Sequence, residues 1–323
     1  MTTWDIFVMI DGKQAGPFKR DQVEELVKQG TVRLEDLAWF EGQGDWEPLQ
    51  KVLTLSVPAL LQAAPVSHAA GAFPNITIDG GQVNPREFIE KGTALHLLGA
   101  WIVLIVGALI LGLMTYGIGL IAALFLPVWN WFQSKKALAL VRGTGIEVGP
   151  NQFPEIHKCA ETLTRRLGMK ETPHVFVVED NTINAKAIKI GSRRVILLID
   201  DAVDACLRSG DPQSLAFILA HEMAHHVLGH TRVIRATLGQ YLKALSRLDE
   251  FTCDAVAARL VEDKTIAARG LAVLTVGPLL MPYLNFEQLR AQAREVAASK
   301  YSKKAERSLT HPLILRRLAR FTA

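Results

Sequence analysis

The sequence predicts an α+β protein with a small N-terminal α+β domain, a transmembrane helical hairpin, and a mainly helical C-terminal domain that contains a small sheet. Three observations predict this architecture. Residues 4–10 have a strand-like pattern before a turn signal, residues 92–134 contain no charged side chain, and residues 215–220 form an apolar helical run that leads into a polar motif. The 323 residues are enough for about two folding units with sizeable cores.

Composition excludes several classes of protein. Hydrophobic residues make up 49% of the chain and charged residues 21%, which excludes disorder as the main state. The excess of four basic residues is small, and no basic run with interleaved aromatic residues occurs, so we expect no nucleic-acid partner. The three cysteines are irregularly spaced and odd in number, which favours a reducing compartment over a disulfide framework.

The N-terminal segment has the pattern of a small α+β unit. A strand over residues 4–10 is followed by an Asp-Gly turn, and a second short strand runs towards residues 16–18. We expect a helix next, capped by Asp21 and ended by Gly30. Four aromatic side chains either form the core of this unit or hold a ligand on its surface, namely Trp4, Phe18, Trp39 and Trp46.

The charge-free run of residues 92–134 is typical of a membrane segment. A single helix of this length would be about 65 Å long, roughly twice the hydrocarbon core of a bilayer, so the run must fold back. Closely spaced glycines mark the turn, which gives spans near residues 94–114 and 118–134, and basic residues on both outer flanks place both termini in the cytoplasm.

The N-terminus lacks the pattern of a signal peptide. Residues 56–91, rich in proline, alanine and glycine over much of their length, predict a flexible tether.

The sequence His221-Glu222-Met223-Ala224-His225 carries the strongest chemical signal. Residues four apart share one face of a helix, so both imidazoles can bind one metal ion while Glu222 reaches the water that the metal activates. Catalytic zinc normally takes a third protein ligand. We favour Glu250, because Asp254 on the same helix face can then accept a hydrogen bond from a ligand imidazole.

Two alternatives for the third ligand remain open. Cys253 is a possible thiolate ligand, although a thiolate would reduce the Lewis acidity that hydrolysis needs. His230 lies near the motif but at the wrong spacing for a third histidine ligand. We expect His226 and His230 to form a structural pair at the helix end, on a different side from His221 and His225.

The N-terminal pattern resembles the GYF-like domains of bacterial membrane proteins. The resemblance is based on Asp-Gly-Lys-x-x-Gly-Pro-Phe from residue 11, a short helix, and Trp39-Phe40 and Asp45-Trp46, and it covers about residues 3–55. It implies an interaction domain over residues 1–55 that holds a proline-rich peptide on its aromatic side chains.

The C-terminal part resembles the HtpX-like and CAAX-prenyl-protease-like membrane metallopeptidases, which are zincins of the gluzincin type. The shared features are His-Glu-x-x-His, the later Glu-x-x-x-Asp, strand-like segments at residues 173–178 and 195–199, and Thr310-His311-Pro312. The resemblance implies a domain over residues 135–323 with one Zn²⁺ held by three side chains, His221, His225 and Glu250. It also implies a substrate strand near Asn184 and Ala185, with His311 as a candidate oxyanion stabiliser.

Two departures from this family concern the membrane. Only 24 residues separate His225 from Glu250, too few for the extra membrane hairpin that HtpX-like members insert there. The apolar residues 270–284 are short for a span and contain two prolines, so we expect helices of the domain there.

The sequence thus predicts a zinc endopeptidase of the bacterial inner membrane that is multi-pass, with Glu222 as general base. Its partners would be protein or peptide substrates and the lipid bilayer, and the family resemblance suggests a role in protein quality control. The rival hypothesis is a membrane scaffold that recruits partners through the GYF-like domain and has an inactive peptidase fold.

Overall fold

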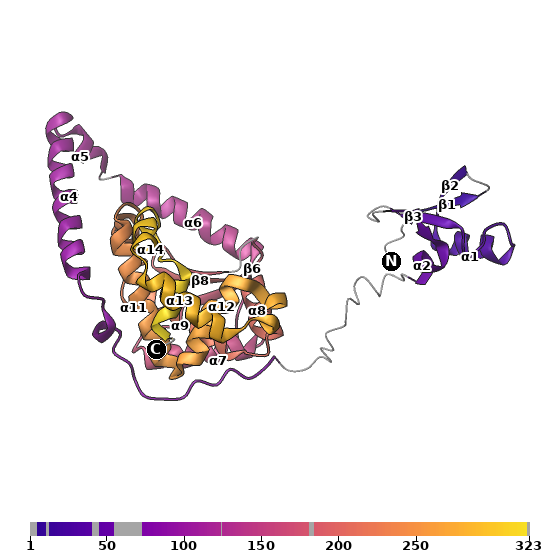
Figure 1. Cartoon of the computed structure of the whole chain (residues 1–323). Coiled ribbons are helices and arrows are strands. Elements are labelled where there is room, and N and C mark those ends of the chain that lie inside the picture. Colours follow the sequence, from indigo (N-terminus) through magenta and orange to yellow (C-terminus); the bar gives the residue numbers. More distant parts are fainter. Residues whose placement is uncertain are drawn as a thin grey trace. The chain divides into compact units, whose positions relative to one another are not determined.

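The structure is a computed structural model that describes residues 5–10, 13–40, 45–54, 73–123, 125–180 and 184–321. The chain divides into two compact units, residues 1–71 and residues 72–323 (Figure 1). Each unit has its own sheet and its own hydrophobic core. The small strand-rich unit and the mainly helical larger unit confirm the α+β fold class.

The N-terminal unit is a four-stranded antiparallel sheet with two helices, in the strand order β2-β1-β3-β4. Its elements are β1 (Ile6–Ile10), β2 (Lys13–Phe18), α1 (Arg20–Lys28), β3 (Leu37–Phe40), β4 (Glu47–Pro48) and α2 (Leu49–Thr54). Alternate residues of β1 point into the core, where Ile6 and Val8 meet Val23 of α1 and Leu49 of α2. The predicted β1–β2 hairpin is confirmed.

Helix α1 begins differently from the prediction. Its N-cap is Lys19, whose backbone amide donates to the Gln22 side chain at 2.7 Å. Because Gln22 already satisfies this amide, no cap at Asp21 is needed, and Asp21 lies in the first turn, where its charge suits the helix dipole. Gly30 follows the helix with a φ of 74°, a conformation that favours glycine.

The four N-terminal aromatic residues occupy different environments. Phe18 pairs with Ile6 across the sheet and packs against the core. Trp39 is half-buried with its ring 5.9 Å from that of Phe7, and Trp46 is also half-buried. Trp4 lies outside the described residues. Phe18 therefore contributes to the core, while Trp39 and Trp46 keep part of their surface accessible.

The larger unit consists of a four-stranded sheet with helices on both of its faces. The strand order is β5-β6-β8-β7, with β6 parallel to β8 and the other pairs antiparallel. The strands are β5 (Ile146–Glu147), β6 (His174–Val178), β7 (Ala185–Ile190) and β8 (Arg193–Ile199). Strands β6 and β8 confirm the two strands expected near residues 173–178 and 195–199. Strand β7 lies at the edge of the sheet.

Helices make up most of this unit. The longer ones are α4 (Thr93–Met114), α6 (Leu126–Thr144), α7 (Pro154–Arg166), α8 (Asp200–Arg208), α9 (Gln213–Val227), α10 (Val233–Tyr241), α11 (Lys243–Val261), α12 (Lys264–Leu280) and α13 (Phe286–Ala298). The shorter ones are α5 (Ile118–Ala123), α14 (Lys300–Ala305), α15 (Ile314–Leu318) and four 3-10 turns, η1 (Pro85–Phe88), η2 (Met281–Tyr283), η3 (Glu306–Ser308) and η4 (Ala319–Phe321).

The two faces of the sheet pack against different helices. Phe176, Ile190 and Val195 form a small core on one face, against which Leu138 and Val141 of α6 pack. Residues on the other face, including Ile196 and Leu198, join the main core with α9. Helix α12 buries residues 271–273 in the same core, which agrees with domain helices, rather than a span, in residues 270–284.

Residues 73–91 pack against the rest of the larger unit, so the predicted tether of residues 56–91 does not extend over its second half. Ile76, Ile78 and Val83 are buried in the main core. The buried Arg166 side chain donates to the carbonyl of Gly81 at 3.0 Å. Gly80 has a φ of 130°, and a β-carbon there would lie 2.4 Å from the Arg166 guanidinium, so a larger residue would push the segment away. Residues 55–72 lie outside the described residues.

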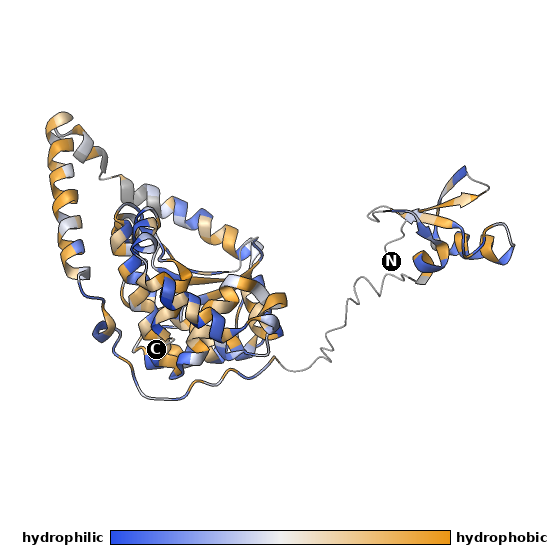
Figure 2. Ribbon diagram, in the orientation of Figure 1, coloured by the Kyte–Doolittle hydropathy of each residue, from blue (hydrophilic) through white to orange (hydrophobic). Residues whose placement is uncertain are grey.

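In the part of the chain that the structure describes, one helix meets the length and composition of a membrane span. This helix is α4, whose best 18-residue window has a mean hydropathy of 2.7 and is 6% buried. Figure 2 shows that apolar residues dominate along it. The second predicted span, residues 118–134, is divided between α5 and the start of α6, and α6 continues to Thr144 because its later turns pack on the sheet. The second crossing stays a prediction.

Candidate active site and metal centre

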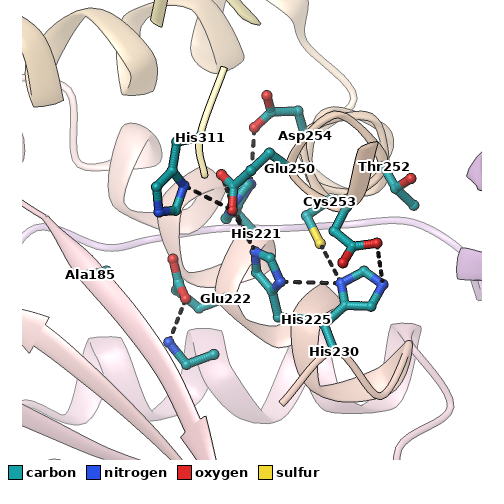
Figure 3. A network of polar contacts seen from close by, with 12 residues as sticks. Ala185, His221, Glu222, His225, His230, Glu250, Thr252, Cys253, Asp254 and His311 are labelled. Carbon is teal, nitrogen blue, oxygen red and sulfur yellow. Dashed lines mark hydrogen bonds and ion pairs between the residues drawn. The ribbon is translucent and has the colours of Figure 1, made fainter. Parts of the chain in front are cut away.

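Helix α9 presents the His-Glu-x-x-His motif from the middle of the core. Its apolar residues are fully buried between the sheet and helices α11 and α12, including Leu215, Leu219 and Met223. The motif lies on the face of α9 that turns towards α11 and towards β7 (Figure 3). A helix buried on nearly all sides holds its side chains in fixed rotamers, and so the two histidines are positioned before any ligand arrives.

Three candidate ligand atoms converge at one point. The Nε2 atoms of His221 and His225 are 3.2 Å apart, and Glu250 of α11 places its carboxylate oxygens 3.5 Å from the first and 3.4 Å from the second. Figure 3 shows Glu250 reaching across from α11 to the two rings. The cluster needs both helices, because the two histidines come from α9 and the glutamate comes from α11.

The acids behind this cluster are held by an arginine that the sequence did not single out. Arg317 of α15 donates to both carboxylate oxygens of Asp254, at 2.8 and 2.6 Å, and lies 3.1 Å from Glu250. Asp254 in turn lies 2.9 Å from Nδ1 of His221. Burial opposes the charged form of both carboxyls, but the positive charge of Arg317 outweighs it and keeps their pKa values below the usual range.

His221 is strongly basic in the absence of a metal ion. Burial lowers the pKa of an imidazole, yet the hydrogen bonds to Asp254 and Glu250 raise the pKa of His221 to about 10. The site is built to hold positive charge beside the two histidines.

Glu222 faces the open side of the cluster. Its carboxylate accepts a hydrogen bond at 2.6 Å from the backbone amide of Ala187 in the edge strand β7. Asn184, at the start of the same strand, accepts a hydrogen bond from the amide of Ala185 at 2.8 Å. Amides of the unpaired strand edge are thus bonded to side chains at the site.

A cavity of about 490 Å³ connects the edge strand with the two histidines. Every residue that the sequence predicted for catalysis, ligation or the substrate strand lines it, namely Asn184, Ala185, His221, Glu222, His225, Glu250 and His311. Asp254 lies behind the cluster and is fully buried. His311 comes from the loop before α15, where its Nδ1 lies 3.1 Å from Glu250, an interaction that raises the pKa of His311.

The prediction that His226 and His230 form a structural pair is wrong, because the two side chains have different partners. His226 is buried against the sheet, where its ring nitrogens lie 3.1 Å from the Val195 carbonyl and 3.0 Å from the Thr231 hydroxyl. His230 lies beside His225 instead. The reason is that α9 ends at Val227 and the chain reverses at Gly229, which has a φ of 78°, so His230 no longer follows the helical register.

Cys253 belongs to a different group of atoms from the one that includes His221. Its thiol lies 3.6 Å from Nδ1 of His230, and within the described residues it joins His225 and His230 rather than His221. Burial, reinforced by the charges of Glu250 and Asp249, raises the pKa of this thiol well above the usual value. The place of Cys253 in the other group of atoms favours Glu250 as the third member of the cluster around His221.

Comparison with known families agrees with this geometry. A model of peptidase family M48 matches residues 150–244, a range that includes His221, Glu222 and His225. This part of the chain is therefore similar to the M48 peptidases. A model of GYF domain 2 matches residues 7–55, so the N-terminal unit is GYF-like as predicted. No solved structure matches the chain significantly.

The match to the M48 family supports a metallopeptidase function with protein substrates. The matched range ends before Glu250, so the role of this glutamate depends on the distances given above. The sequence did not predict three of the contacts at this site. Arg317 binds Asp254, the amide of Ala187 binds Glu222, and His230 contacts His225. No sequence signal separates Arg317 from its neighbour Arg316, and the other two are placed by tertiary contacts.

Proposed function

We propose that the chain is a membrane-anchored zinc endopeptidase. The observation that carries the proposal is the spacing of the candidate ligands: the Nε2 atoms of His221 and His225 are 3.2 Å apart, and the two carboxylate oxygens of Glu250 lie 3.5 Å from the first (Oε2) and 3.4 Å from the second (Oε1). Ligands of a tetrahedral zinc ion are separated by about 3.4 Å when each bond is about 2.1 Å long. Two neutral imidazoles and one carboxylate are also a ligand set that catalytic zinc uses.

The chain's own residues then divide the work of peptide hydrolysis. When bound, zinc would polarise the scissile carbonyl and make a coordinated water more acidic. Glu222 holds no position in the ligand set, and it accepts the proton of the attacking water and returns it to the leaving amine. The Ala187 amide keeps the Glu222 carboxylate at the floor of the cavity, and Asp254 orients the ring of His221.

The edge strand β7 is the proposed substrate platform. Ala187 bonds to Glu222 rather than to β8, so its backbone groups face the open side of the sheet. An extended peptide can add to such an edge as a further strand, which places its backbone beside the two histidines. Asn184 and Ala185 lie at the entry of this edge, and His311 faces them across the cavity as the candidate oxyanion partner.

Glu250→Gln is expected to weaken zinc binding strongly, because a neutral amide is a poorer ligand than a carboxylate. We expect a loss on the order of 100-fold in affinity, measured by competition with a chelator of known affinity. The matched control is Glu287→Gln, which changes an exposed glutamate that pairs with Arg290 on the surface. Unchanged zinc binding in Glu250→Gln would assign the third ligand to Cys253 or His230.

The proposal places both ends of the chain on the cytoplasmic side of the membrane. Helix α4 supplies one crossing, and the apolar stretch after it would supply the return. Reporter fusions at residue 60 and at the C-terminus test this arrangement. We expect reporters that work only in the cytoplasm to be active at both positions, whereas activity at only one of them would show a single crossing.

The GYF-like domain is proposed to recruit proline-rich segments of partner proteins. Trp39 and Trp46 keep accessible surface, and aromatic surfaces suit the preformed extended conformation of such peptides. We expect the full chain to bind a fluorescent proline-rich peptide and a chain that lacks residues 1–55 to lose that binding. Equal binding by both chains would show that the peptide binds elsewhere.

The scaffold hypothesis predicts a different outcome for the same protein. A scaffold with an inactive peptidase fold has no need of a base beside the ligands, yet Glu222 is held at the cavity floor by a specific backbone contact. Failure of the zinc-loaded wild type to cleave any unstructured protein, with the proline-rich peptide still bound, would favour the scaffold.

A further inference from the structure

His225 has two ring nitrogens, and the metal cluster uses only one of them. Its Nε2 faces His221 and Glu250, while its Nδ1 lies 3.2 Å from Nδ1 of His230. Figure 3 shows His225 between His221 on one side and His230 on the other. His230 is mostly buried, with 12% of its side chain exposed, so its contacts are with the protein rather than with solvent.

The protonation state of this pair follows from the role of Nε2. A neutral imidazole that offers the lone pair of Nε2 to a metal ion must carry its proton on Nδ1. That N–H of His225 donates to Nδ1 of His230, which requires His230 to carry its own proton on Nε2. Nε2 of His230 lies 3.4 Å from a carboxylate oxygen of Asp249, and the same oxygen accepts a 2.6 Å hydrogen bond from Arg235.

We propose that His230 is a positioning residue that fixes the tautomer and the orientation of His225 for metal binding. The inference depends on the proposed zinc site and extends it to a residue outside the ligand set. In the row His225, His230, Asp249 and Arg235, each ring N–H faces an acceptor, one N–H of Arg235 donates to Asp249, and neither imidazole needs an unusual protonation state.

The other histidine of the motif has a comparable arrangement. His221 directs its Nδ1 at Asp254, and Asp254 is held by Arg317. Each ligand imidazole is thus supported by a buried carboxylate and an arginine, directly for His221 and through the ring of His230 for His225. Partners of this kind orient metal-binding histidines and raise their basicity, and their loss typically weakens metal affinity about 10- to 100-fold.

A second metal ion on His225, His230 and Cys253 is the competing explanation for the same contacts, since these three also lie close enough to share an ion. It would require His225 to give up its Nδ1 proton and bridge two ions. It would also require Cys253, buried among carboxylates, to ionise. The hydrogen-bonded row needs neither event, and metal stoichiometry separates the two explanations.

The test uses three variants of the full-length chain in detergent. His230→Leu removes the acceptor and keeps the bulk, whereas His230→Asn keeps an acceptor near the position of Nδ1. His226→Leu is the matched control, because His226 is an adjacent buried histidine that contacts Val195 and Thr231 instead of His225. Zinc affinity is measured by chelator competition, and the melting temperature of each variant is measured without metal.

We expect wild type to bind one zinc ion, His230→Leu to bind it about 10- to 100-fold more weakly, and His230→Asn to bind it within a few-fold of wild type. His226→Leu should lower the melting temperature without changing zinc affinity. Unchanged affinity in His230→Leu, or equal losses in His230→Leu and His230→Asn, would overturn the inference. Two zinc ions in wild type, one of them absent from His230→Leu, would replace it with a second metal site. A wild type that binds no zinc would instead overturn the proposed function.

Discussion

Glu222→Gln is expected to reduce peptide cleavage by at least about 100-fold while zinc content stays at one ion per chain. Proton transfer by a positioned side chain is typically worth 10²–10⁴-fold, and glutamine cannot accept the proton of the attacking water. Glutamine can still accept the hydrogen bond from the Ala187 amide, so the fold and the cavity should be unchanged. Cleavage rate and metal content are measured on the same preparation.

The control for this variant is Glu287→Gln, a surface change of the same chemistry. It should leave both rate and metal content unaltered. Full cleavage by Glu222→Gln, in an assay that a chelator still inhibits, would show that the proton is accepted elsewhere. His311 would then be the first candidate, because it faces the same cavity.

Arg317→Leu is expected to destabilise the metal-free larger unit by about 3–5 kcal/mol, since removal of one member of a buried ion pair leaves its partner charged and unpaired. Arg317 contacts both Asp254 and Glu250, so two buried carboxylates would each lose their arginine partner. Chemical denaturation of the detergent-solubilised chain measures the loss. Zinc should reduce it, because a cation beside Glu250 replaces part of the missing charge.

The matched control is Arg259→Leu, which removes an exposed arginine paired with Glu262. Pairs of this kind are worth at most about 1 kcal/mol. Equal losses in the two variants would contradict the role given to Arg317.

Acid should abolish the difference between wild type and Arg317→Leu. The pKa values of Asp254 and Glu250 are lowered in the folded protein, so the stability that they contribute is present above their unfolded values of about 4. This stability is lost progressively as pH falls from that value through the lower pKa values of the folded carboxyls, where they take up protons. A difference in stability that stays constant from pH 7 to pH 3 would show that Arg317 acts through packing alone.

The parts of the site that are close in sequence could be predicted from it. The four-residue spacing of His221 and His225, and of Glu250 and Asp254, places each pair on one face of a helix, and the structure brings both faces together. Arg317 and Ala187 could not be predicted, because each reaches the site through a tertiary contact. His230 was misplaced because one glycine with positive φ ends the helical register that the prediction extended.

The membrane segment and the tether show the same limit. A charge-free run predicts apolar helices, and α4 agrees, but only the packing of α6 on the sheet determines where the second helix begins and ends. Composition alone likewise could not show that Ile76, Ile78 and Val83 are buried in the core of the larger unit.

The most direct test of the central claim is a zinc titration of chelator-stripped, full-length protein with casein cleavage as the readout. We expect no cleavage without metal and full cleavage once about one equivalent of zinc per chain has been added. Undiminished cleavage by the stripped protein, or no cleavage at any zinc concentration, would contradict the assignment of the chain as a zinc endopeptidase.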